Sequence, residues 1–204
     1  MRYFHNDYNR MCHGAVLQKL QSAINDPMIG YGQDEWCKKA QDRVRALCEL
    51  DSANLYFISG GTQANMTVLR SCLRPHQSVL CAQTGHINVH ETGAIEATGH
   101  KVIGLQSSDG RIYAHQIRSY MDNYLSDADA EHTVQPKLVY ISNSTEVGTT
   151  YTREQLKELS DICKEYGLYL FMDGARLGYA LTAEDQDLTL QDIAAHCDVF
   201  YIGL

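Results

Sequence analysis

From residue 54 onward, short runs of apolar residues alternate with longer stretches in which apolar residues recur every three or four positions. Uninterrupted runs of about four to six apolar residues are typical of strands that are covered on both faces. The longer stretches have the spacing of helices with one buried face. We predict strands at 55–58, 78–82, 101–105, 137–142, 168–172 and 199–202. We predict helices between them at 62–73, 88–98, 114–125, 152–165 and 188–196.

This order of elements predicts an α/β fold with a mainly parallel sheet and helices on both of its faces. Within it, Thr152 and Gln155 have the spacing of a capping box, and Gly167 is placed to end the helix that they begin. Residues 126–136 are polar and are expected to form a surface loop.

Two further helices are predicted before the α/β pattern, at 14–25 and 34–49, joined by a turn at Gly30-Tyr31-Gly32. We therefore divide the chain into an N-terminal helical segment at 1–50 and an α/β domain at 51–204. A chain of 204 residues is long enough to bury a core without disulfides or metals.

Charge and composition exclude some classes of partner. The formal net charge is −8, which argues against a nucleic acid or an anionic membrane as the main partner. The N-terminal residues contain no apolar signal core, and no stretch of about 18 apolar residues occurs. We expect a soluble, cytoplasmic protein.

The seven cysteines are scattered, odd in number and without a C-x-x-C pair, so we interpret them as small buried hydrophobic residues in a reducing compartment. His86 and His90-Glu91 could contribute to a zinc site, but the order H-x-x-x-H-E differs from H-E-x-x-H and no clear third ligand follows. No metal is expected.

In open α/β sheets, ligands bind beyond the carboxyl ends of the strands. Four polar stretches lie at such places in the predicted fold, namely Ser59-Gly60-Gly61-Thr62, His86 with His90-Glu91, Asn143-Ser144-Thr145-Glu146 and Asp173-Gly174-Ala175-Arg176. The first places free amides at the start of a helix, which suits a phosphate, although an ordinary strand-to-helix turn has the same composition. His90 is equally consistent with an unremarkable surface histidine.

Asp173 directly follows an apolar strand, where an unpaired carboxylate is costly. One interpretation is an ion pair with Arg176. The other is that the carboxylate pairs with the ring nitrogen of a flat cofactor and keeps that nitrogen protonated, with Gly174 and Ala175 leaving room for the ring. A phosphorylated aromatic cofactor would account for the first and last stretches together.

With these motifs, the chain resembles the threonine aldolases that depend on pyridoxal 5'-phosphate (PLP), in the β-eliminating lyase group of the fold type I superfamily. The resemblance runs through Asn6-Asp7-Tyr8, Gly30-Tyr31-Gly32 with Asp34, Gly60 to Asn65, His86 with Glu91 and Gly93, Thr145-Glu146 with Gly148, Asp173 to Arg176, and Asp198 to Gly203. It implies that residues 51–204 form the PLP-binding large domain of a PLP-dependent transferase-like fold.

The resemblance also implies roles for individual residues. Gly61, Thr62 and the amide of Gln63 would hold the PLP phosphate. His86 would stack on the pyridine ring and help to move protons, with Glu91 as a participant, and Asp173 would pair with the ring nitrogen. On the substrate side, the resemblance implicates Arg176, which would also contact the cofactor, together with Asn6 and Tyr31.

The implied activity is retro-aldol cleavage of a β-hydroxy-α-amino acid, such as threonine or allo-threonine, to glycine and an aldehyde. Alternatives are β-elimination or transamination at the same cofactor, or an inactive homologue that binds a phosphorylated ligand. The expected partners are a small amino acid and further copies of the chain, in a homodimer or homotetramer whose active site lies at the subunit interface, with Tyr31 acting across it.

In this family, the lysine that binds PLP covalently lies a few residues beyond the position of Gly203. None of the seven lysines of this chain occupies such a place. We therefore expect the 204 residues to be a fragment that ends before this lysine and lacks the C-terminal small domain, and to be inactive alone.

Overall fold

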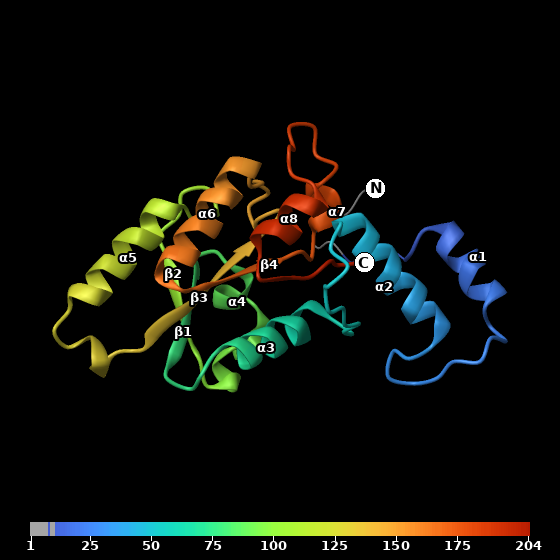
Figure 1. The fold of residues 1–204 in the computed structure, drawn as a ribbon, viewed down its shortest axis with the longest axis horizontal. Helices are drawn as coiled ribbons and strands as arrows, with labels where there is room; N and C mark the ends of the chain where they lie inside the picture. Colours follow the sequence, from blue (N-terminus) through green and yellow to red (C-terminus); the bar gives the residue numbers. More distant parts are fainter. Residues whose placement is uncertain (1–7, 9–10) are drawn as a thin grey trace. The chain divides into compact units, whose positions relative to one another are not determined.

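The computed structural model of the protein describes residue 8 and residues 11–204. Five parallel strands form one sheet in the order β2-β1-β3-β4-β5 (Figure 1). The strands are β1 (Gln77–Ala82), β2 (Lys101–Leu105), β3 (Gln135–Ser142), β4 (Tyr169–Asp173) and β5 (Val199–Phe200). The predicted parallel α/β sheet is confirmed.

Helices cover both faces of this sheet, as predicted. On one face, α5 (Ala114–Ser126), α6 (Arg153–Tyr166) and α8 (Leu190–His196) pack against alternate residues of the central strands. On the other face lie α3 (Gly61–Cys72) and the short α4 (His86–Val89) (Figure 1). The remaining helical elements are α1 (Gly14–Ser22), α2 (Glu35–Cys48), α7 (Leu177–Ala180) and the 3-10 turns η1 (Glu91–Gly93), η2 (Glu96–Thr98) and η3 (Ala130–His132).

The predicted ends of α6 are confirmed. The hydroxyl of Thr152 accepts from the amide of Gln155 at 3.2 Å, and the side chain of Gln155 accepts from the amide of Thr152 at 3.1 Å. Gly167 ends the helix in the left-handed conformation, with φ 65°. This end is specified locally, because glycine adopts positive φ without steric cost.

The strand predicted at 55–58 is wrong. These residues belong to no strand, and the side chains of Tyr56, Phe57 and Ile58 are exposed. A strand needs a neighbour to satisfy its backbone groups, and this segment is not paired with any strand of the sheet given above. An apolar run of four residues is therefore not sufficient to predict a strand.

The single helix predicted at 88–98 is also wrong. The chain here forms α4, η1 and η2 in succession. Glu91, Thr92 and Gly93 all have positive φ, at 61°, 56° and 74°, which breaks the helical path after His90. As a result, Glu91 turns back toward His86 instead of lying along a helix with it.

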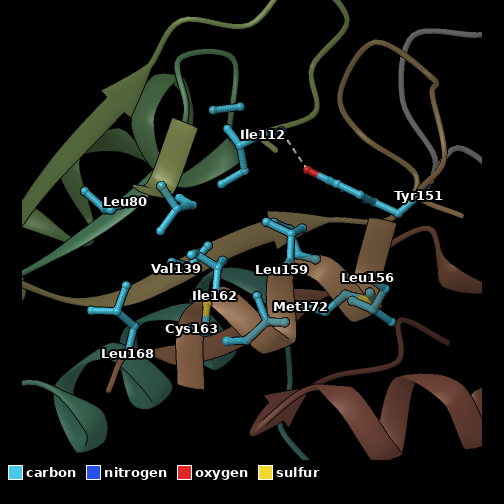
Figure 2. Close-up of a cluster of buried hydrophobic side chains, with 14 of the residues drawn as sticks. Leu80, Ile112, Val139, Tyr151, Leu156, Leu159, Ile162, Cys163, Leu168 and Met172 are labelled. Carbon is cyan, nitrogen blue, oxygen red and sulfur yellow. Dashed lines mark hydrogen bonds between the residues drawn. The ribbon is translucent and has the colours of Figure 1, made fainter. Parts of the chain in front are cut away.

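A large core cluster lies between the sheet and α5, α6 and α8. Figure 2 shows Val139 of β3 facing Leu159 and Ile162 of α6 within this cluster. Tyr151, only 1% exposed, points toward Ile112, and its hydroxyl accepts a hydrogen bond of 2.9 Å from the backbone amide of Ile112 (Figure 2). The ring therefore adds apolar contact to the core, and its hydroxyl satisfies a buried amide.

Replacing Tyr151 with phenylalanine should lower the free energy of unfolding by about 1–3 kcal/mol, because the amide of Ile112 would remain buried without its acceptor. Urea denaturation measures this loss. Tyr179→Phe is the matched control, since Tyr179 is 68% exposed, and it should change stability little. Equal effects of the two changes would show that the buried amide does not need Tyr151.

By their internal contacts, the described residues separate into two compact units. One comprises the described residues up to Ala46 together with Asp51–Phe57, and the other comprises Leu47–Leu50 with Ile58–Leu204. In the first unit, Asp34 accepts from the amides of Trp36 and Cys37 at 2.9 Å each and so begins α2. None of the described residues belongs to a helix long and apolar enough to cross a membrane.

Candidate functional site

The side chains of the candidate site come from one face of three neighbouring strands. Ser142 pairs in register with Asp173, and Met172 pairs with Phe200, so Tyr201 follows β5 beside Asp173. Because side chains alternate along a strand, Tyr140, Asp173 and Tyr201 all point to the face that α3 and α4 cover. The carboxyl ends of the strands thus gather these groups at one edge.

Asp173 is only 3% exposed and accepts four hydrogen bonds. Its Oδ2 accepts from the Tyr140 hydroxyl at 2.5 Å and from Asn65 Nδ2 at 3.2 Å. Its Oδ1 accepts from the Tyr201 hydroxyl at 2.5 Å and from the Ala175 amide at 2.9 Å. A carboxylate offers about four lone-pair positions, so this set of donors fixes the orientation of a buried charge.

The pKa values of Tyr140 and Tyr201 are strongly affected by this carboxylate. Burial, followed by the charge of Asp173 and the hydrogen bond to it, raises the pKa of both Tyr140 and Tyr201 far above the ordinary value. Both therefore remain protonated donors to Asp173 at physiological pH.

The ring of His86 is held by Glu91. His86 Nδ1 lies 2.6 Å from Glu91 Oε1, the Glu91 side chain has no exposed surface, and the His86 side chain is partly exposed. The hydrogen bond to Glu91 is the largest influence and raises the pKa of His86, against the opposing effect of burial. A partly exposed ring whose proton is held by a buried carboxylate suits proton exchange with a bound molecule.

The His86–Glu91 pair should make stability depend on pH. The raised pKa of His86 means that the pair stabilises the fold fully below the unfolded value of about 6.5, and that this contribution is lost as the pH rises through the folded value. We expect the melting temperature to fall over this range, and Glu91→Gln to flatten that part of the profile. Glu131→Gln, which removes the exposed His132–Glu131 pair, is the control; if it flattens the profile as much, the pH dependence does not come from His86.

Glu146 connects three strand ends. Its Oε1 accepts from Ser142 Oγ at 2.7 Å and from the His86 backbone amide at 3.2 Å, and it lies 3.4 Å from Arg176 Nη2. Arg176 Nη2 also donates to the carbonyl of Ser144 at 3.1 Å. The third predicted polar stretch therefore lies with the second and fourth, and Glu146 fixes Arg176 on the Asp173 side of the sheet edge.

The start of α3 adjoins the same group of residues. The first backbone bond of this helix runs from the Ala64 amide to the Gly60 carbonyl, so the amides of Gly61, Thr62 and Gln63 precede it. A Cβ placed on Gly61 would lie 2.8 Å from the Tyr201 hydroxyl, which itself donates to Asp173. These three amides at the positive end of a helix of 12 residues are suited to an anion.

The positions of two predicted substrate residues relative to this site are not described. Asn6 lies outside the described residues. Tyr31 belongs to the other compact unit, where it is fully exposed and has a φ of 65°. Their roles stay predictions.

Three members of the site were missed at the level of sequence: Tyr140, Tyr201 and Asn65. The sequence identifies each of them only as a strand or helix residue, although Asn65 and Tyr201 lie within the family motifs given above. The available signal was periodicity, because Tyr140 and Tyr201 share the strand face on which Asp173 lies.

Outside this site, the described residues also form a surface cavity. A surface cavity of about 310 Å³ beside α5 shares no residue with the site above, and is lined by Leu105, Gln106, His115, Gln116, Ser119, Tyr120 and Asn123. Across the described residues, no three His, Cys, Asp or Glu side chains come together as a metal site.

Comparison with known proteins places the chain among enzymes. A low specificity L-threonine aldolase of a Pseudomonas species is 35% identical over 177 residues, which are 86% of this chain and 49% of that protein. The solved structure of a Leishmania major threonine aldolase is 48% identical with a TM-score of 0.92, and the match covers 97% of this chain and 56% of that one. The chain spans about half the length of the curated relatives that it matches.

A mutant aspartate aminotransferase of Thermus thermophilus shares the fold alone, with 16% identity, a TM-score of 0.53, and coverage of 66% of this chain and 35% of that one. Together with the Leishmania structure, it confirms the predicted fold class. The family model of the beta-eliminating lyases matches residues 13–204, which include every described residue of the site. The resemblance inferred from the motifs is confirmed, and the chain belongs to the beta-eliminating lyase family.

Proposed function

We propose that residues 51–204 form the PLP-binding part of a lyase that cleaves a β-hydroxy-α-amino acid, such as threonine or allo-threonine, to glycine and an aldehyde. The observation that carries the proposal is the Asp173 carboxylate, buried at the end of β4 and connected by a series of hydrogen bonds to the partly exposed His86 ring. The names of the relatives favour threonine as the substrate type.

The residues present fit PLP in three respects. Asp173 is a buried acceptor for a protonated ring nitrogen, the start of α3 offers amides to a phosphate, and His86 offers a flat ring. Asp173 already has four donors, so a ring nitrogen would share an oxygen with one of them or replace it. Tyr201 is the least buried of the three side-chain donors and the one that adjoins Gly61. We therefore propose that Tyr201 is the donor with which the ring nitrogen shares the oxygen, or which it replaces.

When bound, PLP supplies a protonated pyridine ring that withdraws electrons from the bond being broken. In our proposal, Asp173 keeps the proton on the ring nitrogen, and Gly61, Thr62 and Gln63 hold the phosphate through backbone amides. His86 stacks on the ring and exchanges a proton with the substrate hydroxyl, while Glu91 orients it. Arg176, itself oriented by Glu146, contacts the cofactor or binds the substrate carboxylate.

We also propose that the whole protein is a homodimer or homotetramer, with Asn6 and Tyr31 on the substrate side of a site at the subunit interface. In support, α1 has no buried residue, although Val16, Leu17 and Leu20 are apolar and exposed. A second copy of the chain is the partner that would cover this surface. An exposed apolar helix face of this kind is typical of a protein–protein contact.

The products of the PLP-loaded whole protein test the reaction type. With L-threonine or L-allo-threonine, we expect glycine and acetaldehyde in equal amounts, together with a visible absorbance band from the bound cofactor. 2-Oxobutanoate and ammonia would indicate β-elimination instead. A protein that binds no PLP would refute the cofactor assignment.

A further inference from the structure

Asn65 lies between the two buried carboxylates of the site. Its Nδ2 donates to Glu91 Oε1 at 2.7 Å and to Asp173 Oδ2 at 3.2 Å, and the residue is fully buried in α3. A path of hydrogen bonds therefore runs from the His86 ring through Glu91 and Asn65 to Asp173.

The orientation of the Asn65 amide follows from its neighbours. An NH2 group has two hydrogens, and here each faces an acceptor that carries negative charge. The opposite orientation would place Oδ1 against two carboxylate oxygens, which repel it. Asn65 Oδ1 has no hydrogen-bond partner among the described residues, so the donor bonds alone hold the side chain in this orientation.

Glu91 Oε1 is shared between two donors. It faces His86 Nδ1 at 2.6 Å and Asn65 Nδ2 at 2.7 Å. The two donors compete for the negative charge of the same oxygen. The hydrogen bond from Asn65 therefore weakens the interaction of Glu91 with the proton of His86. The second hydrogen of Asn65 also stabilises Asp173, which reduces the repulsion between the two carboxylates.

We propose that Asn65 is a positioning residue that fixes Glu91 and Asp173 at their places and limits how strongly Glu91 retains the proton of His86. The use of these carboxylates in catalysis rests on the proposed function. The coupling between Asn65 and His86 does not, because it involves only groups of the protein.

The other charged groups around His86 come from several elements. Asp173 of β4 and Glu146 of the loop after β3 act in the same direction as Glu91 and raise the pKa of His86. The His90 ring lies 5.1 Å away between centroids. Since Asn65 donates a hydrogen bond to Glu91 and to Asp173, replacing it removes a donor from two of these three carboxylates.

The experiment follows the titration of His86 by NMR in the cofactor-free whole protein, with the signal assigned through His86→Gln. Asn65→Ala should move the titration midpoint of His86 to higher pH. Asn123→Ala, which alters an exposed asparagine of α5, should leave the midpoint unchanged. In a Glu91→Gln background, Asn65→Ala should move the midpoint much less, because the coupling passes through the charge of Glu91.

A purely structural role for Asn65 would lower the melting temperature and leave the His86 midpoint in place, and that result would overturn the proposal. Asn65→Leu keeps the branched shape of the side chain and serves if the alanine variant does not fold. In the unchanged protein, the side-chain NH2 signal of Asn65 should shift with the same midpoint as His86, and an unresponsive signal would also overturn the proposal. Failure of PLP to bind would refute the proposed function and leave this coupling measurable.

Discussion

Replacing Asp173 with alanine should lower the turnover of the PLP-loaded whole protein by about a hundredfold or more. A buried hydrogen bond to a charged group is worth up to about 3 kcal/mol, which corresponds to about a hundredfold in rate. The alanine variant would also leave the Tyr140 and Tyr201 hydroxyls without their acceptor, so its melting temperature should fall. Steady-state release of glycine measures the loss of activity.

Two further variants separate charge from folding. Asp173→Asn keeps the size of the side chain and removes the charge, and it should lose most of the activity while retaining the fold better than the alanine variant. Asp185→Ala alters an exposed aspartate of the same unit and should be nearly neutral. Turnover of Asp173→Asn equal to that of the unchanged protein would refute the role of the charge.

Replacing Gly174 with alanine should destabilise the fold by about 3 kcal/mol or more. A Cβ at this position would overlap the backbone carbonyl oxygen of Tyr201 and lie 3.2 Å from the Cβ of Leu177. Because the obstacle is main chain, it cannot move aside as the end of a flexible side chain can. The change would separate Asp173 from Tyr201, so weaker PLP binding should accompany the loss of stability.

Gly178 provides the matched control for this prediction. It lies in α7, and a Cβ there would meet nothing within 4 Å. Gly178→Ala should leave stability unchanged or raise it slightly, since alanine favours a helix more than glycine does by up to about 1 kcal/mol. Similar melting temperatures for Gly174→Ala and Gly178→Ala would contradict the close approach of Gly174 to the carbonyl of Tyr201.

The elements that could be predicted from the sequence are those specified by local signals. The helix from Arg153 was identified by its capping box and its terminal glycine, and the strands by runs of four to six apolar residues. The segments 55–58 and 88–98 were wrong for different reasons. The first has the composition of a strand without a neighbour in the sheet, and the second breaks at positive φ angles of Glu91 and Thr92, residues that do not ordinarily signal such a break.

The same distinction holds for the site. Asp173, His86 and the start of α3 were predicted because each follows or begins an element at the carboxyl edge of a parallel sheet. Asn65, Tyr140 and Tyr201 were not, because their role depends on which neighbours the strand register and the helix packing bring within hydrogen-bond distance. The sequence indicates Glu146 as a polar residue at the edge, but its ion pair with Arg176 depends on how the strand ends are brought together.

In the proposed function, Asp173 keeps a proton on the ring nitrogen of bound PLP. The most direct measurement is the 15N chemical shift of PLP labelled at that nitrogen, bound to the whole protein near neutral pH and compared with the Asp173→Ala variant. We predict a protonated nitrogen in the unchanged protein and a neutral one in the variant. A neutral nitrogen in the unchanged protein, or the same protonated signal in both, would contradict the claim.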